Sequence, residues 1–109
     1  MKELRWIGSS KNDFLSFPKD IIHDIGFQLH RIQSGKNPSD WKTVHGVPPG
    51  VKEIRIWGAG NTFRVIYVTK FSDVIYILHA FQKKGNMTGA DQKIIKKRFN
   101  KAKKGEWTE

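Results

Sequence analysis

Three consecutive β-type segments, joined by very short turns, constrain the fold of this chain most strongly. They read "VKEIRIW", "TFRVIYVTK" and "DVIYILHAFQ" and occupy residues 51–57, 62–70 and 73–82. All three are rich in β-branched and aromatic residues, and the connections "GAGN" and "FS" are typical turns. Neighbouring strands linked by so few residues must run antiparallel, so the sequence predicts a three-stranded meander.

The residues before the meander predict a strand followed by two helices. Residues 2–7 alternate between apolar and polar side chains, which indicates a short strand. Ser10 and Asp13 have the spacing of a capping box, so a helix is expected to begin there. Pro18 suits the first turn of a second helix, and Gly35 favours its end.

The rest of the chain predicts a loop and a final helix. Residues 36–50 contain three prolines and two glycines and are expected to form a loop. Thr88 and Asp91 repeat the capping-box spacing, and the helix that follows should reach about Lys104. The order β-α-α-β-β-β-α predicts one α+β domain over residues 1–109. In it, two N-terminal helices cover one face of a small, mostly antiparallel sheet, and a basic helix ends the chain.

Charge is the strongest global signal. The formal net charge is +10, and residues 83–104 hold nine Lys or Arg against one acid, Asp91. This run is either a solvated helix face or a surface for RNA or an acidic protein, and Lys97, Arg98 and Lys101 are our RNA-binding candidates. No segment resembles a membrane span or anchor, so nucleic acid is favoured over a membrane as the partner. The absence of cysteine fits a cytoplasmic location.

Cationic side chains recur on the meander strands. Alternation groups side chains by face as follows: Glu53, Arg55 and Trp57; Arg64, Ile66 and Val68; Ile77, His79, Phe81 and Lys83. If the three groups coincide, Arg55, Arg64 and His79 form a cationic surface with an imidazole at one end. Periodicity does not set the register between strands, so this alignment is a hypothesis.

Each of these residues also has a structural interpretation. Arg55 could form an ion pair with Glu53 or Glu3, whereas few acidic residues are available near Arg64 in the sequence. A histidine such as His79 is more often a satisfied core residue than a catalytic one. Lys83 and Lys84 could belong to a solvated turn, and the role of His45, in the Pro/Gly-rich loop, is open.

Several chemistries lack support in the sequence. No carboxylate pair has the pattern of an acid/base dyad, no histidine spacing indicates a metal site, and no phosphate-binding loop is present. No cofactor or metal is therefore expected. The remaining set of Arg, Lys, His and aromatic side chains suits RNA, because guanidinium groups bind phosphates and aromatic rings stack on unpaired bases.

Three segments in order, "VKEIRI", "FRVIYV" and "VIYILHAFQKK", resemble the HigB-like branch of the RelE superfamily of toxins, and the resemblance covers roughly residues 2–100. It implies an endoribonuclease that cuts mRNA, generally on the translating 70S ribosome. It further implies a metal-independent reaction, in which the ribose 2′-OH attacks the adjacent phosphate. A cognate helix-turn-helix antitoxin would bind and silence the toxin.

The resemblance also implies site residues. The family's arginine in "YR" falls on Arg64, its preceding basic residue on Arg55, and its terminal basic pair on Lys83 and Lys84. His79 matches a position that is commonly histidine in this branch. We expect Arg64, assisted by Arg55 or Lys84, to stabilise the transition state, and His79 to transfer the proton, with Lys83 or Lys84 as rival bases.

Two aromatic side chains on the predicted sheet are candidates for contact with RNA. Trp57 or Phe81 could stack on a base. The C-terminal tyrosine used by some superfamily members has no counterpart, because no tyrosine follows Tyr76. A non-catalytic RNA- or DNA-binding module, or a phage-remnant toxin fold without activity, would share the same basic surface.

Overall fold

The structure, a computed structural model, describes residues 1–58, 60–71 and 73–106. These residues form five strands and three helices. In chain order the elements are β1 (Glu3–Trp6), α1 (Ser10–Leu15), α2 (Lys19–Gln33), β2 (Trp41–Thr43), β3 (Lys52–Gly58), β4 (Asn61–Val68), β5 (Val74–Lys83) and α3 (Gly89–Lys103).

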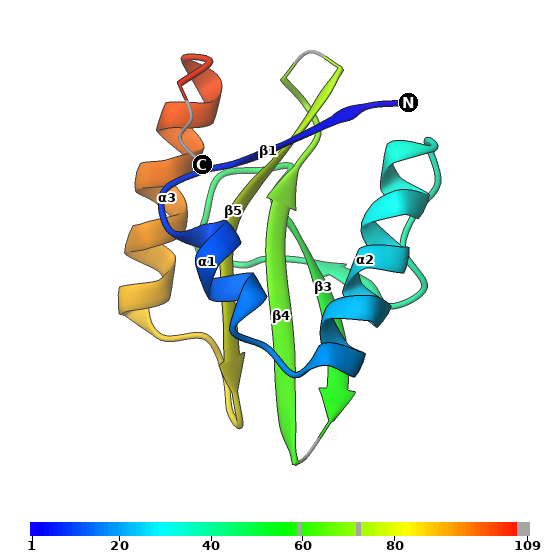
Figure 1. Cartoon of the computed structure of the whole chain (residues 1–109). Helices are drawn as coiled ribbons and strands as arrows, with labels where there is room; N and C mark the ends of the chain where they lie inside the picture. Colours follow the sequence, from blue (N-terminus) through cyan, green and yellow to red (C-terminus); the bar gives the residue numbers. More distant parts are fainter. Residues whose placement is uncertain (59, 72, 107–109) are drawn as a thin grey trace.

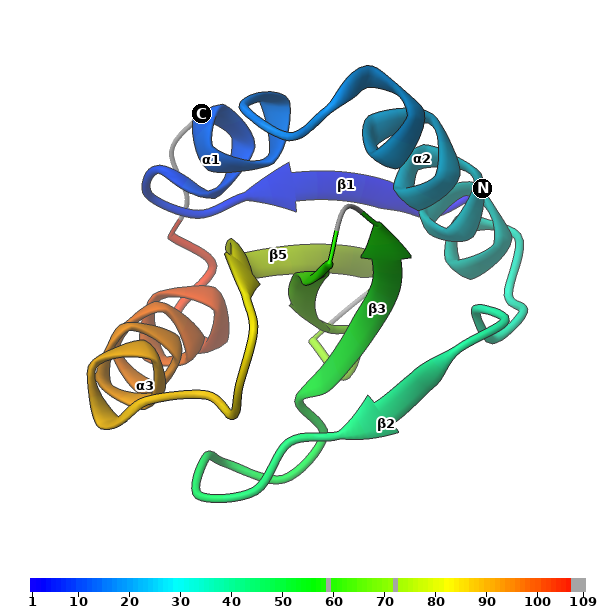
Figure 2. The ribbon, with the colours of Figure 1, turned by 90° about the horizontal axis from the view of Figure 1, so that it is seen from below.

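The strands form one curved sheet in the order β1-β5-β4-β3-β2 (Figures 1 and 2). Strands β3, β4 and β5 make the predicted antiparallel meander, and β1 adds to β5 in parallel. The predicted α+β fold is confirmed. The structure adds one element, because Trp41–Thr43 in the expected loop pairs with β3 as an edge strand.

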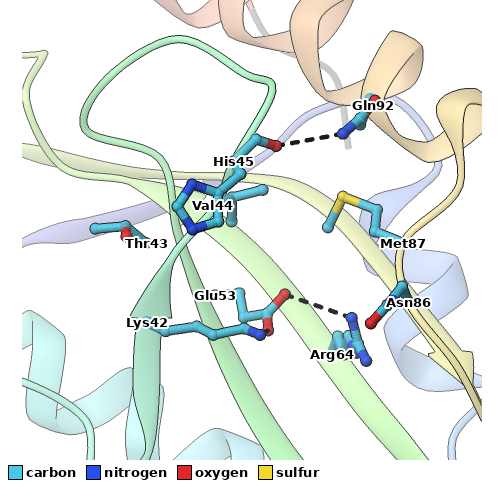
Figure 3. Close-up of a pocket in the computed structure, with 9 residues that line it drawn as sticks. All are labelled: Lys42, Thr43, Val44, His45, Glu53, Arg64, Asn86, Met87 and Gln92. Atoms are coloured by element: carbon cyan, nitrogen blue, oxygen red, sulfur yellow. Dashed lines mark hydrogen bonds and ion pairs between the residues drawn. The ribbon is translucent and has the colours of Figure 1, made fainter.

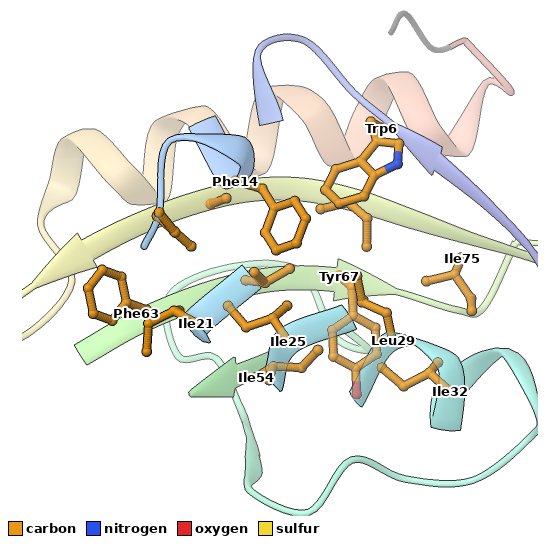
Figure 4. Close-up of a cluster of buried hydrophobic side chains, with 14 residues drawn as sticks. Trp6, Phe14, Ile21, Ile25, Leu29, Ile32, Ile54, Phe63, Tyr67 and Ile75 are labelled. Atoms are coloured by element: carbon orange, nitrogen blue, oxygen red, sulfur yellow. The ribbon is translucent and has the colours of Figure 1, made fainter. Parts of the chain in front are cut away.

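The two N-terminal helices cover one face of the sheet, as predicted (Figure 2). Ile21, Ile25 and Leu29 recur at helical spacing along α2 and pack against strand residues that include Ile54 and Phe63 (Figure 4). This cluster is almost fully buried and forms the larger of two cores.

Helix α3 packs on the opposite face of the sheet. Ile95, Phe99 and Ala102 form its apolar stripe and contact Ile66 and Leu78 of the sheet. This second core lies over β4 and β5. The polar part of the same face lies on β3 and on the part of β4 around Arg64, and no helix of the described residues covers it. That uncovered part carries the candidate site.

A β-bulge in β5 changes the predicted alternation of side chains. Ile66 pairs with His79 while Tyr67 pairs with Ile77, so Leu78 is the extra residue. Strict alternation predicts Ile77 on the same face as His79, but Ile77 belongs to the core beneath α1 and α2. The prediction from strict alternation was wrong here, because one inserted residue moves the β5 side chains that precede it to the opposite face from the one predicted.

The two predicted capping boxes have different outcomes. At α3 the prediction is confirmed, because Thr88 and Asp91 cap each other reciprocally. At α1 the N-cap is Ser9, and its hydroxyl donates to the Asp13 carboxylate at 2.8 Å without a capping box. None of the helices in the described ranges is long and apolar enough to cross a membrane.

Candidate active site

The register of the meander brings the predicted cations together. Arg55 lies directly opposite Arg64 on the neighbouring strand, and Arg64 lies opposite Phe81. Directly opposed residues of antiparallel strands project to the same face. Ile66 and His79 form the next pair of β4 and β5 on this face, two residues along from Arg64 and Phe81, so the hypothesis of one shared face for Arg55, Arg64 and His79 is confirmed.

A buried carboxylate, Glu53, lies among three of these cations. Its side chain is 1% exposed. The Lys42 Nζ and Arg55 Nε atoms are each 3.7 Å from Glu53 Oε1, and Arg64 Nη1 is 3.9 Å from Oε2. Arg55 Nη2 is also 3.5 Å from the Asp40 carboxylate. The structure therefore shows ion pairs for Arg55, including the one with Glu53 that the sequence left open.

The cluster of Lys42, Glu53, Arg55 and Arg64 is held at distances too long for hydrogen bonds. Within the described residues, buried Glu53 Oε1, Arg55 Nε and Arg64 Nε have no hydrogen-bond partner. Glu53 was not among the site residues predicted from the sequence. The signal was present in "EIR", because residues two apart on a strand share a face.

Arg64 is the most enclosed cation of the site. Its side chain is 10% exposed, and Nη2 donates to the Gly85 carbonyl at 2.9 Å. The guanidinium carbon also lies 6.0 Å from the centre of the Phe81 ring. A guanidinium has five N–H donors, so this fixed orientation leaves donors for a ligand.

His79 and Lys83 share a second carboxylate, Asp91. His79 Nε2 lies 3.0 Å from Asp91 Oδ1, and Lys83 Nζ donates to Oδ2 at 2.5 Å. The Thr88 backbone N–H and hydroxyl also donate to Oδ2, at 3.0 and 2.8 Å. This arrangement ties the end of β5 to the first turn of α3.

The environment shifts both titrations in this second cluster. Burial raises the pKa of Asp91, but hydrogen bonds from Lys83, His79 and Thr88 outweigh burial and hold the pKa well below its usual range. Burial lowers the pKa of His79 more than the Asp91 hydrogen bond raises it. His79 is 9% exposed and stacks on Phe81 with ring centres 4.7 Å apart.

A cavity of about 200 Å³ opens beside Glu53 and Arg64 (Figure 3). Its walls come from β2 and the loop after it, from β3, from β4 and from the start of α3. The lining residues are Lys42, Thr43, Val44, His45, Glu53, Arg64, Asn86, Met87 and Gln92. Figure 3 shows the His45 ring turned toward the side of the cavity where Lys42 and Glu53 lie.

The other predicted substrate contacts have different positions. Trp57 is 67% exposed and shares the face of Arg55 and Arg64 at the end of the β3–β4 hairpin. Phe81 is half-buried between His79 and Arg64. Lys84 is exposed next to Gly85, and no ion pair involves it in the described ranges.

The candidates on α3 lie apart from this cavity. Arg98 donates to the Leu78 carbonyl at 3.0 Å and to Ser9 Oγ at 3.1 Å, which ties α3 to β5 and to the start of α1. Lys97 and Lys101 flank it and line a different hollow that includes Gly8. The roles predicted for Lys97, Arg98 and Lys101 in RNA binding stay predictions.

The part of the chain that the structure describes shows no cluster of metal-binding side chains. There, no three His, Cys, Asp or Glu side chains are gathered so that they could hold a metal ion. The chemistry that this site offers is therefore that of fixed cations, two imidazoles and two buried carboxylates.

Comparisons with known proteins agree with this arrangement. The family model "Phage derived protein Gp49-like (DUF891)" matches residues 12–104. A crystal structure of the isolated E. coli RelE toxin is similar, with a TM-score of 0.60 at 11% identity over 89% of this chain and 98% of that chain. The search of curated proteins finds no match. The chain therefore belongs to the Gp49-like family of phage-derived proteins, and it has the fold of the RelE toxin, which is the fold that the resemblance in the sequence implied.

Proposed function

We propose that this protein is the toxin of a type II toxin–antitoxin system, of the HigB-like branch, and that it cleaves mRNA on the translating ribosome. The observation that carries the proposal is the pairing of Arg55 and Arg64 on one face, with Arg64 lining a cavity. Family membership and fold support it. The reaction is a metal-independent attack of the ribose 2′-OH on the neighbouring phosphate.

Arg64 is the main phosphate-binding group in this reaction. Attack on the phosphate adds negative charge, and a guanidinium fixed in advance stabilises that charge without reorganising. The Gly85 carbonyl fixes the orientation of Arg64, and the N–H groups that it does not use remain for phosphate oxygens. Arg55, opposite Arg64 on the neighbouring strand, and the exposed Lys84, next to Gly85, assist.

The two buried carboxylates position these groups. Glu53 keeps Lys42, Arg55 and Arg64 close together despite their mutual repulsion. Asp91 anchors His79 and Lys83 and joins β5 to α3, so we assign these two residues to the stability of the fold beside the site rather than to the reaction.

Substrate and partner contacts complete the proposal. Trp57 stacks on an unpaired base, and the Phe81 ring packs against the Arg64 guanidinium. Lys97 and Lys101 contribute a positive surface that contacts ribosomal or messenger RNA phosphates. A helix-turn-helix antitoxin silences the toxin, and both act in the cytoplasm.

The test compares three proteins expressed without antitoxin: wild type, Arg64→Ala, and Arg31→Ala as a control on α2. We expect wild type and Arg31→Ala to arrest growth and to leave mRNA fragments with 2′,3′-cyclic phosphate ends. Arg64→Ala should cleave roughly 100- to 1,000-fold more slowly, as when one preorganised donor is removed.

Three other outcomes contradict parts of the proposal. Equal arrest by equally expressed Arg64→Ala removes the role of Arg64. Shielding of RNA by wild type, without new ends, indicates a non-catalytic RNA-binding module. Neither arrest nor binding indicates a toxin fold that has lost its activity.

A further inference from the structure

The four histidines of the chain occupy different environments. His23 and His30 are exposed on α2, whereas His79 is buried and held by Asp91. His45 alone among them lines the cavity that contains Glu53 and Arg64, and it is exposed there. The imidazole that a substrate in this cavity can contact is therefore that of His45.

The loop that carries His45 is fixed against α3. The His45 carbonyl accepts from Gln92 Nε2 at 3.3 Å (Figure 3). The Val44 N–H donates to the Val51 carbonyl at 3.3 Å. Gly46 follows with φ +76°, and a Cβ there would lie 2.6 Å from Gln92 Nε2. The Gln92 side chain could move away from such a Cβ, so it is the positive φ that favours glycine at this turn, next to the hydrogen bond that joins the loop to α3.

The charged groups around this cavity leave few proton acceptors. Lys42 comes from β2, Glu53 from β3 and Arg64 from β4, while α3 contributes the uncharged Gln92. Arginine does not release its proton, and a lysine is an ammonium ion near neutral pH. Glu53 is 1% exposed and shared by three cations. Histidine is the side chain that can accept a proton at neutral pH.

We propose that His45 is the general base of the ribonuclease reaction, a proposal that rests on the function proposed above. The neutral ring takes the proton of the ribose 2′-OH. The 2′-oxygen forms a bond to phosphorus as the bond from phosphorus to the 5′-oxygen breaks. The departing 5′-oxygen takes a proton from water, and the hydroxide left behind recovers the proton from the imidazolium. A 2′,3′-cyclic phosphate and a 5′-hydroxyl result.

The experiment measures single-turnover cleavage of a defined mRNA on stalled ribosomes from about pH 5 to about pH 9. It compares wild type with His45→Gln, with His79→Gln, and with His30→Gln as an exposed control. We expect His45→Gln to lose roughly 100-fold or more in rate and to lose the lower inflection of the pH profile. His30→Gln should match wild type, and added imidazole should partly rescue His45→Ala.

Binding separates a catalytic role from a structural one. An mRNA with a 2′-deoxy nucleotide at the scissile position cannot react, and we expect His45→Gln to bind it on the ribosome as tightly as wild type. If binding is lost together with cleavage, His45 acts in recognition and the proposal is overturned.

Two results overturn the proposal in distinguishable ways. If His45→Gln keeps the rate and the inflection while His79→Gln loses both, His79 is the base and the ribonuclease function stands. If wild type itself produces no cleavage while it binds RNA, the proposed function fails, and the role of His45 fails with it.

Discussion

Two buried carboxylates gather cations on the same side of this molecule, but they do so in different ways. Asp91 accepts short hydrogen bonds, at 2.5 Å from Lys83 and 2.8–3.0 Å from Thr88, and lies 3.0 Å from His79 Nε2. Around Glu53, the nearest nitrogen atoms of its three cations are 3.7–3.9 Å away. The carboxylate of the first cluster is fully hydrogen-bonded, although His79 Nδ1 is buried there without a partner among the described residues. The second cluster is loose and lies beside a cavity.

The difference indicates which cluster is built for the fold and which for a ligand. Satisfied hydrogen bonds around Asp91 join β5 to α3, and breaking them weakens the fold. Among the described residues, the Nε atoms of Arg55 and Arg64 are buried without a hydrogen-bond partner. Unsatisfied buried donors are costly, so this cluster is not arranged for stability alone. Arg64 also lines the cavity, where a phosphate is the kind of partner that its guanidinium binds.

Replacing Glu53 should have the largest effect on stability. Glu53→Gln leaves three cations close together without a counter-charge, and we expect the free energy of unfolding to fall by about 3 kcal/mol. Inorganic phosphate should restore more stability to this variant than it adds to wild type, because the anion replaces the lost charge. Urea denaturation with and without phosphate measures both effects.

Unchanged stability in Glu53→Gln would mean that the loose cluster does not depend on its carboxylate. A phosphate effect equal in both proteins would mean that the anion binds elsewhere.

Replacing Asp91 should cost slightly less stability and should spare the chemistry. Asp91→Asn weakens the capping box and the contacts with His79 and Lys83, and we expect a loss of about 2 kcal/mol. Cleavage per folded molecule, measured at a temperature where the variant is fully folded, should stay close to wild type. A large loss of kcat at full folding contradicts the division between the two clusters.

The sequence predicted the meander and the helices well because their signals are local. Alternation, Gly-rich turns and the Thr88–Asp91 capping box each depend on residues close together in the chain. The β-bulge at Leu78 left no such signal, because it is defined by pairing between two strands. Strand β2 was missed for a similar reason, since three residues within a Pro/Gly-rich segment become a strand only when β3 is there to pair with them.

The sequence allowed the cationic residues of the site to be predicted, but it did not reveal all the residues that contact them. Arg55 and Arg64 stood out as charges within apolar strands. The sequence could not show that Glu53 contacts both arginines, or that a loop from residues 44–51 brings His45 to the same cavity. These are contacts set by register and by loop closure.

The free energy of unfolding should depend on pH in two separate ranges, one set by His79 and one set by Asp91. The lowered pKa of His79 means that the unfolded chain binds a proton more readily, so stability should fall as pH drops below about 6.5. Asp91 has a depressed pKa, so its contribution is present above about pH 4 and is lost as pH falls further. Urea midpoints should show the first decline flattened in His79→Gln and the second flattened in Asp91→Asn. Identical profiles in all three proteins contradict the assignment.

The smallest effects should separate two adjacent lysines. Lys84 is exposed and has no ion pair in the described ranges, so Lys84→Ala should change the free energy of unfolding by less than about 0.5 kcal/mol. It should still reduce the salt dependence of RNA binding by about one phosphate contact, a change of roughly 0.7 in the slope of log K against log salt. Lys83→Ala should instead lower stability, because Lys83 donates to Asp91. If both variants change stability and the salt slope alike, Lys83 does not serve the fold while Lys84 serves ligand binding. The contrast between the two carboxylates then has no functional meaning.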